Sequence, residues 1–236
     1  MAKMKLIVFN VEQGRCIYLR TPSDYGILID CTESSSKSQI EWLEKNEVPS
    51  LKLYKGNAIT PNIAPIEDSD FGVNVRRFSL SKQEAEQLGG DVQQQANNQS
   101  VVTIVSYKSP EDYAWKVVIA GDNETKGWEA LLAKPEFSAA VADADFFVTS
   151  NYGQDCGFCA ELFNTMGKPI ANITSTRKDA EPADSKYKKH AQGVKFPDGS
   201  RKHFITRGDG NITVEMHDDG NYDVWLFTPS IEEEKK

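Results

Sequence analysis

The chain has 236 residues, 39% hydrophobic and 26% charged, which is enough for one sizeable globular core and excludes general disorder. Its formal net charge of −8 argues against wholesale coating of nucleic acid or of an anionic membrane, because the average surface field would repel both. No apolar run approaches the roughly 18 residues of a membrane span, and no signal peptide precedes the first strand-like run. We therefore expect a cytoplasmic protein without a membrane partner.

The first part of the chain alternates as β-strands do. Apolar runs separated by turn residues predict strands over Lys5–Phe9, Cys16–Arg20 and Ile27–Asp30. Ser38 predicts the start of a helix over Gln39–Glu47. Residues 51–72 have a poorer pattern and are expected to be mainly loop with one edge strand.

The next segment combines a strand, a helix and a polar stretch. After a predicted strand over Asn74–Leu80, Ser81 and Glu84 have the spacing of a capping box, which predicts a short helix through Leu88. The segment Gly89–Gln99 is rich in glutamine and asparagine, and we expect a mobile loop there.

The second half alternates strands with helices. The pattern predicts strands over Ser100–Tyr107, Trp115–Ala120, Asp145–Thr149, Ile170–Ser175, His203–Thr206, Ile212–Met216 and Tyr222–Phe227. An amphipathic helix through Trp128 and Leu132 and a second helix over Cys156–Met166 lie between them, and Gly208–Gly210 predicts a turn. Without a repeat or a linker at the midpoint, we predict one layered α/β (α+β) domain over residues 1–230, with a charged, fraying tail at 231–236.

Five short motifs follow one another along the chain. They are Val8–Cys16 with Ile27–Asp30, Asn97–Val102, Ala120–Asp122, Thr149–Gly153, and the closing segments Ala183–Tyr187 and Ile205–Val214. In this order they resemble the metallo-β-lactamase-fold domain of ComEC-type DNA-uptake proteins and their soluble relatives. The resemblance implies a four-layer αββα sandwich, here with a truncated N-terminal half.

The metal-binding histidines of that family are missing from this chain. The family carries an H-x-H-x-D-H loop after the third strand, whose metal ions activate a water on a phosphodiester or ester. Here Ser50 is followed by Leu51–Tyr54 without a histidine, and the family's P-H-H-G position corresponds to Asn151 and Tyr152. Asparagine and tyrosine are weak ligands for zinc-like ions.

The remaining residues imply a cleft that has lost its metals. By the resemblance, Asp122 matches the bridging carboxylate of active members, and Arg15 places a cation close to the metal position. We expect a remnant cleft lined by Arg15, Asp30, Asp122, Asn151 and Tyr152, with no cofactor. Asp30 and Asp122 are weak candidates to bind Mg²⁺, Mn²⁺ or Zn²⁺, and a structural role is the favoured interpretation of each.

Residues 177–207 carry nine Lys or Arg against four Asp or Glu, so this stretch is locally basic. The candidates for contact with an anion, or with the phosphates of a nucleic acid, are Lys186, Lys188, Lys189, His190 and Arg207. A solvated loop is the favoured interpretation of the stretch. His190, His203 and His217 lack the spacing of a metal-ligand pair, and we expect all three at the surface.

Cys156 and Cys159 have C-x-x-C spacing at the predicted start of a helix, where the helix dipole would favour a thiolate. Packing or incidental thiols are the favoured interpretation, with a metal site and a redox pair as alternatives.

These patterns lead to two main hypotheses for function. The first is a catalytically degenerate metallo-β-lactamase-fold protein that acts as a binding or scaffolding subunit of a multi-subunit protein complex. Soluble relatives of this kind are often encoded in bacterial multi-gene systems, including anti-phage defence, so this role rests on analogy with the family. The alternative is a divergent metal-dependent phosphodiesterase or nuclease that uses Asp30 and Asp122, with Asp155 or Asp184. A thiol sensor built on Cys156 and Cys159 is a third, weaker hypothesis.

Overall fold

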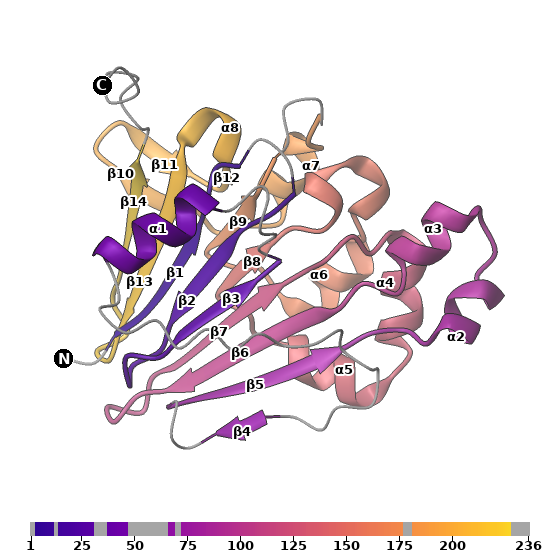
Figure 1. The fold of residues 1–236 in the computed structure, drawn as a ribbon, viewed down its shortest axis with the longest axis horizontal. Helices are drawn as coiled ribbons and strands as arrows, with labels where there is room; N and C mark the ends of the chain where they lie inside the picture. The colour runs from indigo at the N-terminus through magenta and orange to yellow at the C-terminus, as the bar shows by residue number, and fades with distance from the viewer. Residues whose placement is uncertain are drawn as a thin grey trace.

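The structure, a computed structural model, describes residues 3–11, 14–30, 37–46, 66–68, 72–176 and 181–227. Two β-sheets face each other across a common core, and helices lie on their outer faces (Figure 1). The prediction of a mixed α/β protein is confirmed. The segment Leu51–Tyr54 and the tail at 231–236 lie outside the described residues. None of the described helices has the length and apolar character needed to cross a membrane.

The smaller sheet brings the two ends of the chain together. Its strands lie in the order β14 (Tyr222–Phe227), β13 (Asn211–His217), β1 (Lys3–Val8), β2 (Ile17–Arg20) and β3 (Gly26–Ile29). All neighbouring pairs are antiparallel. Apolar residues on both faces of β1 let Leu6 face the other sheet while Ile7 faces outward. Helix α1 (Lys37–Asn46) packs on this outer face through Leu43.

The larger sheet positions most of the candidate site. Its strands lie in the order β12 (His203–Ile205), β9 (Ala171–Thr174), β8 (Phe146–Val148), β7 (Ala114–Ile119), β6 (Val102–Lys108), β5 (Val73–Phe78) and β4 (Ile66–Asp68). Strands β12, β9, β8 and β7 are parallel neighbours, so their carboxyl ends meet at one edge of the sheet. The helices between them are α4 (Thr125–Leu132), α5 (Pro135–Val141), α6 (Ala160–Met166) and α7 (Asp184–Lys189).

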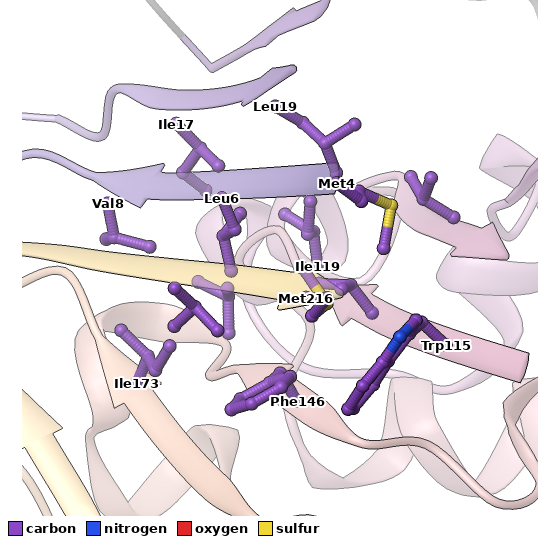
Figure 2. Packing of buried hydrophobic residues seen from close by; sticks show 14 of the residues in the cluster. Met4, Leu6, Val8, Ile17, Leu19, Trp115, Ile119, Phe146, Ile173 and Met216 are labelled. Atoms are coloured by element: carbon purple, nitrogen blue, oxygen red, sulfur yellow. The ribbon is translucent and has the colours of Figure 1, made fainter. Parts of the chain in front are cut away.

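Two apolar cores separate the layers. Figure 2 shows Leu6 and Ile17 of the smaller sheet pointing toward residues of the larger one such as Phe146, and these residues belong to one buried cluster. Behind the larger sheet, Trp128 of α4 and Phe163 of α6 pack against its other face. The layers therefore follow the order helix, sheet, sheet, helices. Each fully buried large apolar side chain contributes about 1.5–3 kcal/mol, so these two cores are the main source of stability.

The prediction of a mobile loop over Gly89–Gln99 is wrong. Helix α3 (Val92–Asn97) occupies this segment and begins with a capping box, in which the Asp91 side chain accepts from the Gln94 N–H at 2.8 Å. In return, Gln94 Oε1 accepts from the Asp91 N–H at 3.0 Å. The polar composition hid the same spacing that correctly predicted the Ser81 capping box of α2 (Lys82–Gln87).

The helix predicted over Cys156–Met166 is shorter than expected. Asp155–Gly157 form a 3₁₀ turn, η2, and α6 begins only at Ala160. A second 3₁₀ turn, η1 (Asn151–Gly153), precedes it. Near the end of the chain, a hairpin of β10 (Val194–Phe196) and β11 (Gly199–Arg201) is followed by β12 and α8 (Thr206–Asp209), a short helix where a turn was predicted.

Candidate functional site

The five residues predicted to line a cleft come together around Arg15. Arg15 precedes β2, Asp30 follows β3, and Asp122 follows β7, while Asn151 and Tyr152 follow β8. Nη2 of Arg15 lies 2.9 Å from Oδ1 of Asp122, and its Nη1 lies 3.8 Å from Oδ2 of Asp30. The guanidinium carbon lies over the Tyr152 ring, 5.0 Å from its centroid, in cation–π contact. We call these five residues the Arg15 cluster.

The guanidinium is buried while its two carboxylate partners stay partly in water. The Arg15 side chain is 4% exposed, against 39% for Asp122 and 47% for Asp30. Nη1 of Arg15 also donates to the carbonyl of Ala120 at 3.0 Å, which fixes the side chain to the end of β7. Protein surrounds Asp30 on most sides although part of its surface touches solvent. This desolvation raises its pKa, Arg15 opposes the rise, and Asp122 adds to it.

Three of the six described non-glycine residues with a left-handed φ lie in the same cluster. Asp30, Asn151 and Tyr152 have left-handed φ values of 57°, 44° and 55°, which non-glycine residues adopt rarely. Such conformations cost about 1–3 kcal/mol each and tend to gather at functional sites. The N–H of Asn151 donates to the carbonyl of Gly121 at 3.1 Å, so the strained turn after β8 is held against the end of β7.

The residues of the Arg15 cluster do not fit a divalent metal ion. Within the described part of the chain, no group of three or more His, Cys, Asp or Glu side chains is placed to hold one. Asp30 and Asp122 offer two carboxylates, but the fixed positive charge of Arg15 already lies against both. A second cation in the same place would be repelled by the guanidinium at short range.

Several of the buried polar atoms that lack a hydrogen-bond partner among the described residues lie at the carboxyl edge of the parallel strands. They include Oδ1 of Asn123 after β7, Oγ of Ser175 and Oγ1 of Thr176 after β9, and Nε of Arg15. A buried polar group left unpaired costs about 1–3 kcal/mol. Ligands of α/β sheets usually bind at this edge. The unpaired atoms can therefore form hydrogen bonds with water or with a ligand bound here.

The prediction of a surface position for His203 is wrong. Its side chain is fully buried, with Nε2 2.7 Å from Oγ1 of Thr174 and Nδ1 2.8 Å from Oδ1 of Asp184. These are the partners and distances of a nucleophile with its general base. Thr174 is itself completely buried, however, so a substrate has no access to its hydroxyl. The three side chains tie β9, β12 and α7 together.

The position of His203 in its strand was the signal for its burial. His203 begins the short strand His203–Ile205 and is followed by the apolar Phe204, which is fully buried. The spacing of the three histidines tests for a metal-ligand pair only and carries no information about burial. His217 is partly buried and bonds to Asp223 through Nε2 at 2.9 Å.

Three of the five candidate anion-binding residues have carboxylate partners. Lys186 pairs with Asp155, Lys188 with Asp184 at 2.5 Å, and Arg207 with Glu181 at 3.7 Å. Lys189 is exposed at the end of α7. The His190 ring stacks on Phe163 with 4.7 Å between centroids. The local excess of positive charge is thus reduced by its own neighbours.

The two cysteines are not activated thiols. Cys156 is exposed, and Cys159, at the N-cap of α6, is buried. Burial raises the pKa of both, that of Cys159 to about 11, so both are protonated near neutral pH. The Cys156 sulfur accepts from Nδ2 of Asn151 at 3.1 Å, which links η2 to the Arg15 cluster.

Comparison with known proteins adds no family to this geometry. No protein-family model matches the chain, and none of the curated proteins matches it.

Proposed function

We propose that this chain is a catalytically degenerate metallo-β-lactamase-fold protein that acts as a binding or scaffolding subunit of a larger protein complex. Two facing sheets with helices on both outer sides agree with the four-layer αββα sandwich expected from the motif order. The observation that carries the proposal is the position of Arg15 between Asp122 and Asp30.

A guanidinium can replace the charge of a metal ion but not its chemistry. It carries one positive charge, and here it lies against two carboxylates. It does not lower the pKa of a bound water as a metal ion does, so it generates no hydroxide nucleophile. The contact with Ala120 and the Tyr152 ring hold it in place. The Arg15 cluster is therefore a fixed group of polar residues that is suited to binding and not to hydrolysis.

The test compares metal binding by the natural protein and by Arg15→Ala. We expect the natural protein to contain no stoichiometric transition metal and to keep its Tm when Mn²⁺ is added. Arg15→Ala leaves Asp30 and Asp122 without their cation, so Mn²⁺ at about ten times its Kd should raise the Tm of this variant by a few degrees. Elemental analysis and thermal melting measure the two effects.

Arg20→Ala is the matched control, since Arg20 pairs with Asp24 on the surface at 2.8 Å and lies outside the cluster. Its Tm should not respond to Mn²⁺. One or two zinc or manganese ions per chain in the natural protein would overturn the proposal. An Arg15→Ala protein indifferent to Mn²⁺ would contradict the role given to the guanidinium.

The competing proposal is a metal-dependent phosphodiesterase or nuclease. Its support is that the carboxylates of Asp30 and Asp122 both remain partly exposed beside Arg15. The further ligands it would use are engaged elsewhere, Asp155 with Lys186 and Asp184 with His203. Hydrolysis of DNA, RNA or cyclic nucleotides with Mg²⁺ or Mn²⁺, lost in Asp122→Ala, would establish this function in place of the first.

A further inference from the structure

Strand β14 is the longest edge strand among those that the structure describes. It forms the outer border of the smaller sheet, and among the described strands only β13 pairs with it (Figure 1). Its six residues, YDVWLF, contain one charge and no proline, and they pair with β13 in continuous register without a bulge. The edge strands β3, β4 and β12 have four, three and three residues. Charge, proline, bulges or short length normally protect such edges, and β14 has almost none of these features.

The phase of the ladder shows which backbone groups of β14 face outward. The N–H of His217 donates to the carbonyl of Asn221 at 2.9 Å, which makes these residues a hydrogen-bonded pair. Hydrogen-bonded and non-hydrogen-bonded pairs alternate along an antiparallel ladder. The backbone groups that point away from β13 therefore belong to Tyr222, Val224 and Leu226. A row of N–H and C=O groups at strand spacing is matched by the backbone of another extended segment.

An apolar groove adjoins this edge on the outer face of the same sheet. It has a volume of about 320 Å³ and lies between Trp42 of α1 and Trp225 and Phe227 of β14. These aromatic side chains are 39%, 46% and 57% exposed. Glu215, one of its lining residues, pairs with Lys3 at 3.0 Å and with Lys5 at 3.1 Å, so both ammonium groups already have a carboxylate partner. The groove therefore suits apolar side chains better than a phosphate.

We propose that β14 is the docking edge for an extended, apolar segment of a partner protein with basic residues at its ends. The segment adds a sixth strand to the smaller sheet and lays side chains beside Trp225 and Phe227. The inference rests on the proposed binding function and names how the partner is held. A second copy of this chain is disfavoured, because each copy carries a net charge of −8 and exposes Asp219 and Asp223 near this edge. The same charge attracts a basic segment.

The test uses synthetic peptides with an alternating valine–threonine core. One peptide has lysines at both ends, a second has glutamates, and a third has lysines but a proline in the core. We expect the lysine peptide to bind the full chain about tenfold more tightly than the glutamate peptide, and the proline peptide not to bind. Fluorescence anisotropy measures affinity, and amide hydrogen exchange should show protection at Tyr222, Val224 and Leu226.

Two variants of β14 and one control locate the binding. Val224→Pro removes an outward N–H without removing a bond to β13, and Trp225→Lys puts a charge beside the groove. Each should weaken binding of the lysine peptide at least about tenfold. Val92→Lys changes an apolar residue, 84% exposed on α3, and should bind as the natural chain does. Circular dichroism and thermal melting check that every variant is folded.

Protection at β14 that Trp225→Lys and Val224→Pro both abolish supports the proposal. Unchanged exchange at β14, or equal binding of the lysine and glutamate peptides, would overturn it. So would self-association through β14, detected by sedimentation and abolished by Val224→Pro, since the occupant would then be a second copy. If the peptides do not bind to β14 and the natural protein contains no metal, the strand-docking inference fails and the proposed function stands. Stoichiometric metal in the natural protein overturns the proposed function, whatever the peptides show.

Discussion

The buried imidazole of His203 is surrounded by groups that act on its charge in opposite directions. Its ring lies 5.2 Å from that of Tyr187 and bonds to Thr174 and Asp184. Burial lowers its pKa most strongly. Asp184 and Asp209 raise the pKa, and Lys188 lowers it further. Because burial dominates, the folded protein favours the neutral ring below the ordinary pKa of 6.5.

Because the pKa of His203 is lower in the folded than in the unfolded chain, we predict that this residue makes stability depend on pH. Between its folded pKa and 6.5, the unfolded chain binds more protons than the folded chain, so stability falls as the pH drops through this range. Asp145 acts in the opposite direction, since burial raises its pKa to about 6 and its protonation favours the folded state. The natural chain and His203→Gln must therefore be compared at each pH.

We expect urea unfolding to show that the advantage of the natural chain over His203→Gln shrinks as the pH falls from about 7.5 toward about 5. Asp145 is present in both proteins and cancels in the difference. A difference that stays constant over this range would mean that the buried imidazole keeps its ordinary pKa.

At the scale of elements, residues at the end of helix α3 cap the start of helix α4. Residue Glu124, the N-cap of α4, supplies no side-chain cap of its own. Instead, Oδ1 of Asn98, the C-cap of α3, accepts from the Glu124 N–H at 3.0 Å. Nδ2 of Asn97 also donates to Oε1 of Glu124 at 2.8 Å. The close approach is possible because Gly127 has no side chain, since a Cβ there would lie 2.3 Å from Oδ1 of Asn98.

Gly127→Ala should therefore destabilise the protein although alanine is the better helix former. Displacing Asn98 from the α4 cap and overpacking this contact should cost about 1–3 kcal/mol. This cost should outweigh the roughly 1 kcal/mol that alanine gains over glycine in helix propensity, so the free energy of unfolding should fall. The control is Gly208→Ala in α8, where no atom lies within 4 Å of an added Cβ. Thermal and urea unfolding measure both. Equal stability of Gly127→Ala and the natural chain would show that Asn98 moves aside freely.

Some of these elements could be predicted from the sequence and others could not. Apolar, β-branched runs predict strands β6 and β7, and the capping box that predicts α2 lies within four consecutive residues. Helix α3 has the same local signal at Asp91, but four of its six residues are polar and none of the six is buried, so it relies on Glu124, far along the chain. Long-range support of this kind leaves no periodicity in the sequence.

At the scale of the whole molecule, the sequence predicted which residues make the Arg15 cluster but not how they interact. The resemblance pointed to them by their places in its motifs, with Asp30 at the end of the third strand, Asp122 at the bridging carboxylate and Asn151 at the P-H-H-G position. The 2.9 Å contact between Arg15 and Asp122 exists only because one sheet lies over the other. That packing depends on many apolar residues at once, and no local pattern encodes it.

The smaller sheet couples the stability of the two ends of the chain, because β1 pairs with β13. Leu6 of β1 lies opposite Val214 of β13, and both side chains are almost completely buried. The same core includes β6 and β7 of the larger sheet, whose other face packs against α4. We therefore predict that the described layers unfold as one cooperative unit.

Leu6→Ala tests this prediction, because the cavity it leaves should lower stability by about 2–4 kcal/mol. If the layers form one unit, the slowest-exchanging amides of β1, β13 and α4 should lose the same amount of opening free energy. Val92→Ala, at an exposed position on α3, should leave these amides unchanged. Native-state hydrogen exchange measures each amide separately. A loss confined to β1 and β13, with α4 unaffected, would mean that the smaller sheet opens independently of the helices behind the larger one.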